Sequence, residues 1–227
     1  QNIMFDICNP DNTLILSISK FCTDEFTKIY GDKYLKFERK FLLNSSELNP
    51  KVYNKVFNYQ KFITTQKVKP VILGNWNKSQ EKLNLTKDNF TKLKSLLPDF
   101  EFRQLKTLKN INIREHYQEI SDIYSEADIY LSLSIHEGNS YALLDAFNKN
   151  LLICCSNVGL CYGDIPDDVG VILEWEKCSD MEYVAEKIKY LWVNREKFRN
   201  KSKEYFDENL NFNNWKKEIK NIIESIN

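Results

Sequence analysis

Short apolar runs alternate with amphipathic segments from residue 67 to the end of the chain. Apolar runs bounded by glycine, proline or polar clusters are typical of buried strands, whereas apolar positions that recur every three or four residues predict helices. Strands are therefore expected at 70–74, 100–105, 111–113, 129–133, 151–155 and 169–173. Helices are expected at 79–97, at 116–126, after residue 138 and through the last part of the chain.

This alternation predicts an α/β fold, in which a Rossmann-like parallel sheet carries helices on both faces and is followed by a helical C-terminal tail. Ligands of such sheets bind at the carboxyl ends of the strands. Gly74, Glu137 and the loop after Cys155 are all expected at that edge. A ligand site is therefore predicted there.

The first 66 residues have a different pattern. A strand is expected at 13–18, a helix that opens at Thr23 and ends at Gly31, and a second apolar run at 39–43. Residues 48–66 are aromatic and basic with little period. We therefore divide the chain into residues 1–66 and a sheet domain at 67–227.

The composition limits the classes of partner and the cellular compartment that are expected for this chain. The 32 basic and 32 acidic residues cancel, which argues against nucleic acid. No apolar run approaches the ~18 residues that a spanning helix needs, and no secretory segment is recognisable near the start. The six cysteines form no C-x-x-C pair, and the adjacent Cys154 and Cys155 fit opposite faces of a buried strand. We expect a reduced, cytoplasmic chain without a metal site.

The strongest candidate site follows the strand at 129–133. The chain turns through Glu137 and Gly138, and Asn139 and Ser140 suit the first turn of the next helix. Unpaired backbone N–H groups and the helix dipole make such a start an anion site, most often for phosphate. Gly138 allows a ligand to approach because it has no Cβ atom.

A second carboxylate lies further along the same helix. Asp145 shares the open face with Tyr141, whereas Leu143, Ala146 and Phe147 are predicted to be core. The first carboxylate precedes the helix and the second lies two turns in, which separates them by about 10 Å along the axis. This spacing suits a ligand with a diphosphate in its middle and hydroxyl groups at both ends. An ordinary strand–turn–helix with surface acids is the alternative.

The arrangement Glu137-x7-Asp145 resembles the E-x7-E signature of GT-B glycosyltransferases, in particular the retaining family 4. The resemblance implies that Glu137 borders the transferred sugar as the catalytic acid and that the amides from Gly138 to Tyr141 hold the diphosphate. It implies that Asp145, one methylene shorter than the usual Glu, binds the ribose. The implied donor is a nucleoside diphosphate sugar, and no cofactor or metal is implied.

A second family motif, G-R-L-x-x-x-K, corresponds to the segment that begins at Gly74. In the family its Arg and Lys clamp the leaving diphosphate. Here Asn75 replaces the Arg, and Lys78 or Lys82 is the candidate for the Lys; the alternative is that both lysines are solvated. Arg114 corresponds to the region that contacts the nucleotide base.

Two further positions border the predicted site. His136 is either a neighbour of the donor or a residue of the rim. The loop at 157–160 matches the place of the family's N-x-G-G, whose main chain approaches the donor sugar.

The resemblance also suggests how the chain is organised. Residues 1–66 match the end of the N-terminal acceptor domain and the linker, and 67–227 match the donor domain. The implied reaction transfers a sugar to an acceptor hydroxyl with retention and without a metal. The acceptor is undefined (glycan, lipid or protein), and peripheral membrane contact through the rest of the first domain is conceivable. A noncatalytic GT-B-like module and a sugar-nucleotide 2-epimerase are the alternatives.

Overall fold

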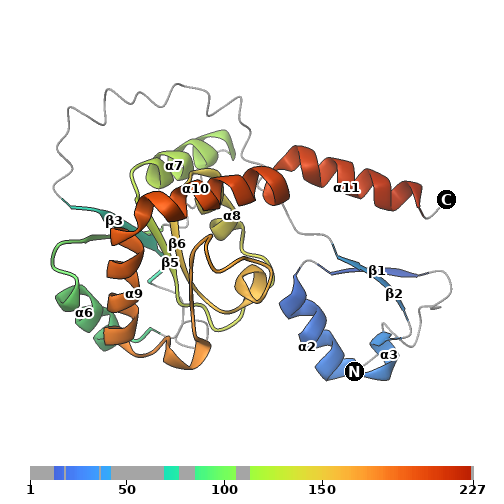
Figure 1. Ribbon diagram of the computed structural model, residues 1–227, viewed down its shortest axis with the longest axis horizontal. Helices are drawn as coiled ribbons and strands as arrows, with labels where there is room; N and C mark the ends of the chain where they lie inside the picture. Colours follow the sequence, from blue (N-terminus) through green and yellow to red (C-terminus); the bar gives the residue numbers. More distant parts are fainter. Residues whose placement is uncertain are drawn as a thin grey trace.

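The main body of the protein is a five-stranded parallel sheet. The computed structural model describes residues 13–17, 19–35, 37–41, 69–76, 85–105 and 113–225 (Figure 1). The strand order is β4-β3-β5-β6-β7, and each neighbouring pair is parallel. The strands are β3 (Val71–Gly74), β4 (Glu101–Gln104), β5 (Ile129–Ser132), β6 (Leu152–Ser156) and β7 (Val171–Leu173). The predicted Rossmann-like α/β fold is confirmed.

Helices cover both faces of this sheet. One face packs on α6 (Lys87–Leu96) and α9 (Met181–Val193), and the other packs on α7 (Ile113–Ser125) and α8 (Tyr141–Asn148). Successive strand residues alternate between the two layers, so buried Cys154 belongs to the first core and buried Cys155 to the second, as predicted. The predicted core residues of α8 are confirmed: Leu143, Ala146 and Phe147 are all buried.

The C-terminal tail is helical, as expected. Helix α10 (Arg195–Tyr205) crosses above the sheet and continues through a π-helical turn, Phe206–Leu210, towards α11 (Phe212–Glu224) (Figure 1). Phe198 joins the core under α9, whereas Tyr205 packs on the core under α8. Thus α10 links the two layers.

A buried carboxylate connects α10 to the sheet at the start of β5. Asp128 is 4% exposed, and its Oδ2 accepts a hydrogen bond of 2.8 Å from the backbone N–H of Val71. Its Oδ1 lies 3.6 Å from a guanidinium nitrogen of Arg199. The side chain therefore satisfies an amide at the start of β3 and a cation on α10 at the same time.

The N-terminal residues form a small separate sheet. Strands β1 (Leu14–Ser17) and β2 (Glu38–Phe41) are parallel, and α2 (Lys20–Tyr30) and α3 (Asp32–Leu35) connect them. The hydroxyls of Ser17 and Tyr34 are hydrogen-bonded at 3.0 Å beneath these helices. Helix α2 contacts the short 3-10 helix Gly159–Cys161, which brings it to the carboxyl edge of the main sheet.

Three predicted boundaries were wrong. Helix α2 begins at Lys20 rather than Thr23, because the Ser19 side chain accepts from the N–H of Cys22 and caps it. Helix α6 begins at Lys87 because Thr86 caps it; residues 77–84 lie outside the described part of the chain. Ile113 begins α7 instead of ending a strand, and residues 111–112 are not described.

We predict that Asp128→Ala lowers the free energy of unfolding by about 3 kcal/mol. The variant leaves a buried N–H of Val71 without its acceptor and removes the partner of Arg199, and each loss is costly in a buried setting. Chemical denaturation monitored by circular dichroism measures the change. The matched control is Glu204→Ala, which breaks the exposed Lys201–Glu204 pair on α10 and should cost under about 1 kcal/mol. Equal losses in both variants would contradict the assigned role of Asp128.

Candidate functional site

The turn between β5 and α8 holds the Glu137 carboxylate by a chain of serines. The Ser134 hydroxyl donates to Glu137 Oε1 at 2.9 Å, and the Ser132 hydroxyl donates to that of Ser134 at 3.3 Å. From β6, the Ser156 hydroxyl donates to the carbonyl of Ser134 at 2.6 Å. The half-buried carboxylate of Glu137 is therefore fixed in orientation by its own turn and by the neighbouring strand.

The loop after β6 packs directly on this turn. Gly159 has a φ of +58°, and a Cβ atom there would lie 2.7 Å from the carbonyl oxygen of Gly138. It would also lie 3.0 Å from the carbonyl oxygen of Glu137. Both the backbone conformation and the space require glycine at this position. The loop at 157–160 therefore meets the main chain of the predicted sugar site.

The first turn of α8 differs from most other described helix starts. Ser19, Thr86, Asp180 and Asn211 each accept a hydrogen bond from the first turn of their own helix. Ser140 is the N-cap of α8 but makes no such bond. Its side chain instead hydrogen-bonds the buried Tyr130 hydroxyl, whose pKa is raised mainly by burial. The Leu143 N–H in the first turn donates to the Ser140 carbonyl at 3.1 Å, but no first-turn amide of α8 receives a side-chain acceptor from Ser140.

Asp145 lies about one turn into α8, on the side that meets α7. The Tyr124 hydroxyl of α7 donates to the carbonyl of Ala142 at 3.0 Å, and the Lys149 ammonium donates to the Ser121 hydroxyl at 2.8 Å. Burial lowers the pKa of Lys149 to about 8, against the opposing effect of the carboxylates of Asp122 and Asp145. Asp145 therefore belongs to a partly buried network between the two helices.

The loop after β3 is held to β4 through the side-chain amide of Asn75 and the backbone N–H of Trp76. The Gln104 side chain on β4 donates to Asn75 Oδ1 at 3.0 Å and accepts from the N–H of Trp76 at 2.8 Å. A Cβ atom at Gly74 would lie 2.7 Å from the carbonyl oxygen of Leu131, so the strand end passes close to β5. Asn75, which replaces the family's Arg, is thus engaged by its neighbouring strand.

The remaining predicted site residues have different outcomes. Lys78 and Lys82 lie outside the described residues, and so does the side chain of Arg114. Arg114 lies in the first turn of helix α7, instead of following a strand as expected. His136 is exposed beside the turn, and Asn139 is buried at the start of α8. Tyr141 is 65% exposed on the open face of α8, as its spacing predicted.

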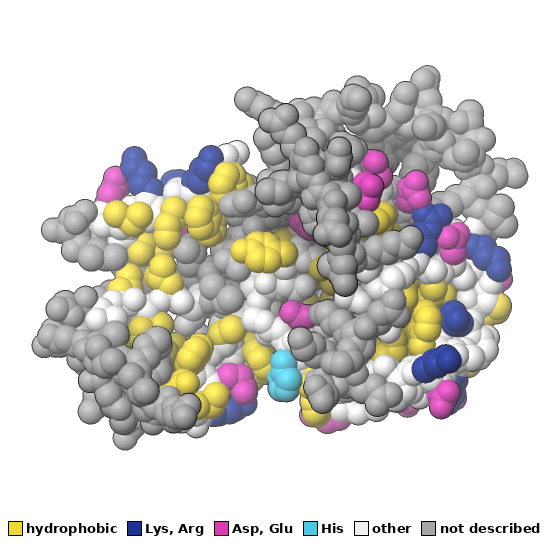
Figure 2. Space-filling model, turned by 180° about the vertical axis from the view of Figure 1, so that it is seen from behind, with side chains coloured by type: hydrophobic (Ala, Val, Ile, Leu, Met, Phe, Trp, Pro, Cys, Tyr) yellow, Lys and Arg dark blue, Asp and Glu magenta, His cyan; other side chains and the backbone are white. Residues whose placement is uncertain are grey.

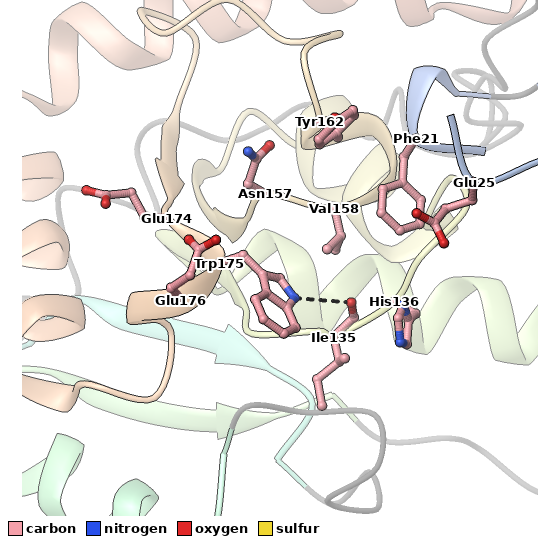
Figure 3. Close-up of a pocket in the computed structure, with 10 residues that line it drawn as sticks. All are labelled: Phe21, Glu25, Ile135, His136, Asn157, Val158, Tyr162, Glu174, Trp175 and Glu176. Carbon is pink, nitrogen blue, oxygen red and sulfur yellow. Dashed lines mark hydrogen bonds between the residues drawn. The ribbon is translucent and has the colours of Figure 1, made fainter. Parts of the chain in front are cut away.

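A cavity of about 310 Å³ opens at the same edge, and sequence reasoning missed most of it. It lies between α2 and the loops that follow β5, β6 and β7 (Figure 3). The overlooked signal was the run Glu174-Trp175-Glu176 directly after β7, at the carboxyl edge where ligands bind. The lining residues are Phe21, Glu25, Ile135, His136, Asn157, Val158, Tyr162, Glu174, Trp175 and Glu176.

On the face seen in Figure 2, basic and acidic side chains are interspersed. Within the described ranges, no group of three or more His, Cys, Asp or Glu residues is placed to hold a metal ion. No helix in that part of the chain combines the length and apolar character needed to cross a membrane.

Solved structures with this arrangement identify the fold. No sequence-family profile matches the chain, and no curated protein matches it significantly. Sucrose-phosphate synthase from Thermosynechococcus elongatus superposes on 94% of the chain, with a TM-score of 0.67 and 13% sequence identity. A glycosyltransferase from Rickettsia africae covers 99% of the chain, with a TM-score of 0.63 and 14% identity. The fold is the GT-B fold.

The GT-B likeness includes proteins solved with nucleotides. The pneumococcal O-GlcNAc transferase GtfA, in complex with UDP and GlcNAc, covers 94% of the chain, with a TM-score of 0.57 and 15% identity. This chain spans 58%, 66% and 45% of the lengths of these three proteins, respectively. At such low identity the likeness establishes the fold, and the chemistry must be argued from the residues of this chain.

The lowered pKa of Lys149 predicts a pH dependence of stability. Between about 8 and the ordinary value of 10.5, the unfolded chain keeps a proton on Lys149 that the folded chain has released. Unfolding then takes up a proton, so rising pH favours the folded state through this group. The unfolding free energy of the wild type, minus that of Lys149→Met, should therefore increase from pH 8 upwards.

Urea denaturation of both proteins at several pH values between 7 and about 10 measures this difference. The tyrosines and cysteines that titrate in the same range are common to both proteins and cancel. A difference that stays constant with pH would show that the Lys149 ammonium is as well solvated when folded as when unfolded.

Proposed function

We propose that this chain is the donor-binding part of a glycosyltransferase, which transfers a sugar from a nucleoside diphosphate sugar to an acceptor hydroxyl. The observation that carries the proposal is the start of α8, whose amides receive no side-chain cap from Ser140 and lie beside Glu137 at the carboxyl edge of a GT-B sheet. Such a helix start attracts the diphosphate of a nucleotide sugar. Structures of similar fold support the same ligand class, since Anabaena HepE was solved with UDP-glucose.

The donor has a defined orientation in this proposal. The diphosphate lies at the first turn of α8, near Gly138 and Tyr141. The sugar extends towards Glu137, whose carboxylate accepts from Ser134 and can also accept a sugar hydroxyl. The nucleoside extends along α8 towards Asp145, where a carboxylate can accept hydrogen bonds from both ribose hydroxyls.

The reaction breaks the bond between the anomeric carbon and the diphosphate oxygen and forms one from the same carbon to the acceptor oxygen. The acceptor hydroxyl loses its proton, and the diphosphate leaves with additional negative charge. Amides at the start of α8 are already oriented towards that charge, and preorganised donors of this kind lower the barrier. We propose that transfer proceeds with retention and without a metal, with Lys78 or Lys82 as the additional cation.

One observation favours a second candidate, a noncatalytic GT-B-like binding module. Asn75 occupies the place of the family's Arg and is hydrogen-bonded to Gln104, so this position supplies no positive charge to the leaving group. The two candidates differ in a simple measurement. A transferase hydrolyses or transfers its donor slowly even without the natural acceptor, whereas the module binds the nucleotide and leaves the donor intact.

The amide of Tyr141 can be tested without disturbing the helix. Ser140 has extended dihedral angles (φ −73°, ψ 117°), which are compatible with a following proline, and proline is well tolerated at the first helical position. Tyr141→Pro removes one amide hydrogen, and Tyr141→Ala removes the same side chain but keeps it. Calorimetric titration with UDP and GDP should show about ten to a hundred times weaker binding for the proline variant than for the alanine variant.

Equal affinities of the two variants would exclude the Tyr141 amide from diphosphate binding. If neither UDP nor GDP binds to the unmodified chain, the proposed function itself fails.

The ribose contact makes a second prediction. Asp145→Asn should weaken UDP binding by about ten- to a hundred-fold, because a carboxylate that accepts from two hydroxyls is replaced by a neutral amide. It should have little effect on 2′,3′-dideoxyuridine diphosphate, which lacks both hydroxyls. The matched control is Asp122→Asn, which removes the other carboxylate that acts on Lys149. Equal losses for both nucleotides, or an equal loss in the control, would contradict the ribose contact.

A further inference from the structure

The cavity between α2 and the carboxyl edge of the sheet has a chemistry that donor binding does not use. Its central feature is Trp175, which follows β7 and is 44% exposed (Figure 3). The indole N–H donates to the carbonyl oxygen of Ile135 at 3.4 Å. This bond holds one edge of the ring against the turn that follows β5. The ring therefore presents an apolar face whose orientation is set before any ligand arrives.

The opposite wall of the cavity is also aromatic. Phe21 of α2 and Tyr162 of the β6–β7 loop both line the cavity, and their rings pack edge to face with centroids 5.7 Å apart. Val158 lies between them and Trp175 (Figure 3). Flat apolar surfaces on two sides suit a ligand with apolar C–H faces.

The polar groups of the lining are mostly hydrogen-bond acceptors. The acidic residues Glu25, Glu174 and Glu176 line the cavity together with Asn157, although the Glu174 carboxylate points away from it (Figure 3). Lys28 and Lys177 pair with Glu25 and Glu174 at 2.8 Å, but neither lysine is among the lining residues that the structure describes. Carboxylates accept hydrogen bonds from hydroxyls and repel anions. The cavity is thus suited to a hydroxyl-rich ligand and unsuited to a phosphate.

We propose that this cavity binds a neutral sugar unit of the acceptor, with one C–H face of the pyranose ring on Trp175 and its hydroxyls directed to the carboxylates. The identification as acceptor rests on the proposed function; the sugar site itself rests on the cavity. Its volume of about 310 Å³ lies at the lower end of ligand pockets.

The position of the cavity fits an acceptor. Val158 lines both this cavity and a much smaller one that contains Glu137 and Ser140. His136, at the mouth of the cavity, directly precedes Glu137 in the chain. A sugar bound here therefore lies beside the place of the transferred sugar and away from the diphosphate amides.

The test is saturation-transfer NMR on the full chain with single methyl glycosides of glucose, galactose, mannose and N-acetylglucosamine, and with methyl glucuronide as the anionic counterpart. At least one neutral glycoside should bind, with the strongest transfer to the C–H protons of one ring face. The glucuronide should bind more weakly because the carboxylates of Glu25 and Glu176 repel its negative charge. Saturating UDP should not displace the glycoside.

Variants locate the bound sugar. Trp175→Ala should weaken glycoside binding about tenfold, and Trp175→Phe should retain most of it, because an aromatic face remains. Trp175 is exposed and anchored by a single bond, so the fold should survive, and circular dichroism checks this. Tyr141→Pro, which acts on the diphosphate amides, should leave glycoside binding unchanged.

The outcomes separate the two proposals. Absence of binding by every neutral glycoside, unchanged binding in Trp175→Ala, or displacement by UDP would overturn the sugar site. Glycoside binding that depends on Trp175 in a chain that binds neither UDP nor GDP would support the sugar site while refuting the glycosyltransferase.

Discussion

Parallel pairing of five short strands is the constraint on which the structure depends. Residues of β3, β5 and β6 are buried on both sides of the sheet, and helices α6, α7 and α8 connect β3 to β4, β4 to β5 and β5 to β6 across its faces. The loops that follow the strands then gather at one edge, whatever their separation in the chain. Asp128 secures the opposite edge, where it joins β3, β5 and α10. The buried Asp128 contacts and the candidate site thus lie at opposite ends of the same strands.

Most of the fold could be predicted because its signals are local. Strands β3, β5 and β6 could be predicted because strands buried on both faces are continuous apolar runs. Helix α9 could be predicted because its apolar residues recur with helical periodicity. Two errors arose at helix starts, where a single polar side chain determines which residue begins the helix. Ser19 and Thr86 begin helices by accepting one backbone hydrogen bond each, which residue periodicity does not reveal. Ile113 was misassigned because a short apolar run fits a strand and a helix start equally well.

The candidate site was predictable only where it is continuous in sequence. Glu137, Gly138 and Ser140 are close because they belong to one turn, so a motif was enough to find them. The network of Asp145 depends on the packing of α7 against α8, which brings Tyr124 and Ser121 from an earlier segment. Trp175 was missed for the same reason, since its hydrogen-bond partner Ile135 and the facing Phe21 of the cavity come from distant parts of the chain. Contacts of this kind follow from topology and cannot be read from spacing.

The close approach of Gly159 to Gly138 couples the loop after β6 to the loop after β5. The main chains of the two loops touch with no side chain between them, so neither can shift without displacing the other. The loop that contains Gly159 follows β6 and lines the cavity that contains Trp175. The loop that contains Gly138 follows β5 and leads into α8. A ligand that moves one of these loops therefore also moves the other. Ligand binding in the cavity and ligand binding at the start of α8 are thus thermodynamically linked. Such coupling is reciprocal: if the first ligand changes the affinity for the second by some factor, the second changes the affinity for the first by the same factor.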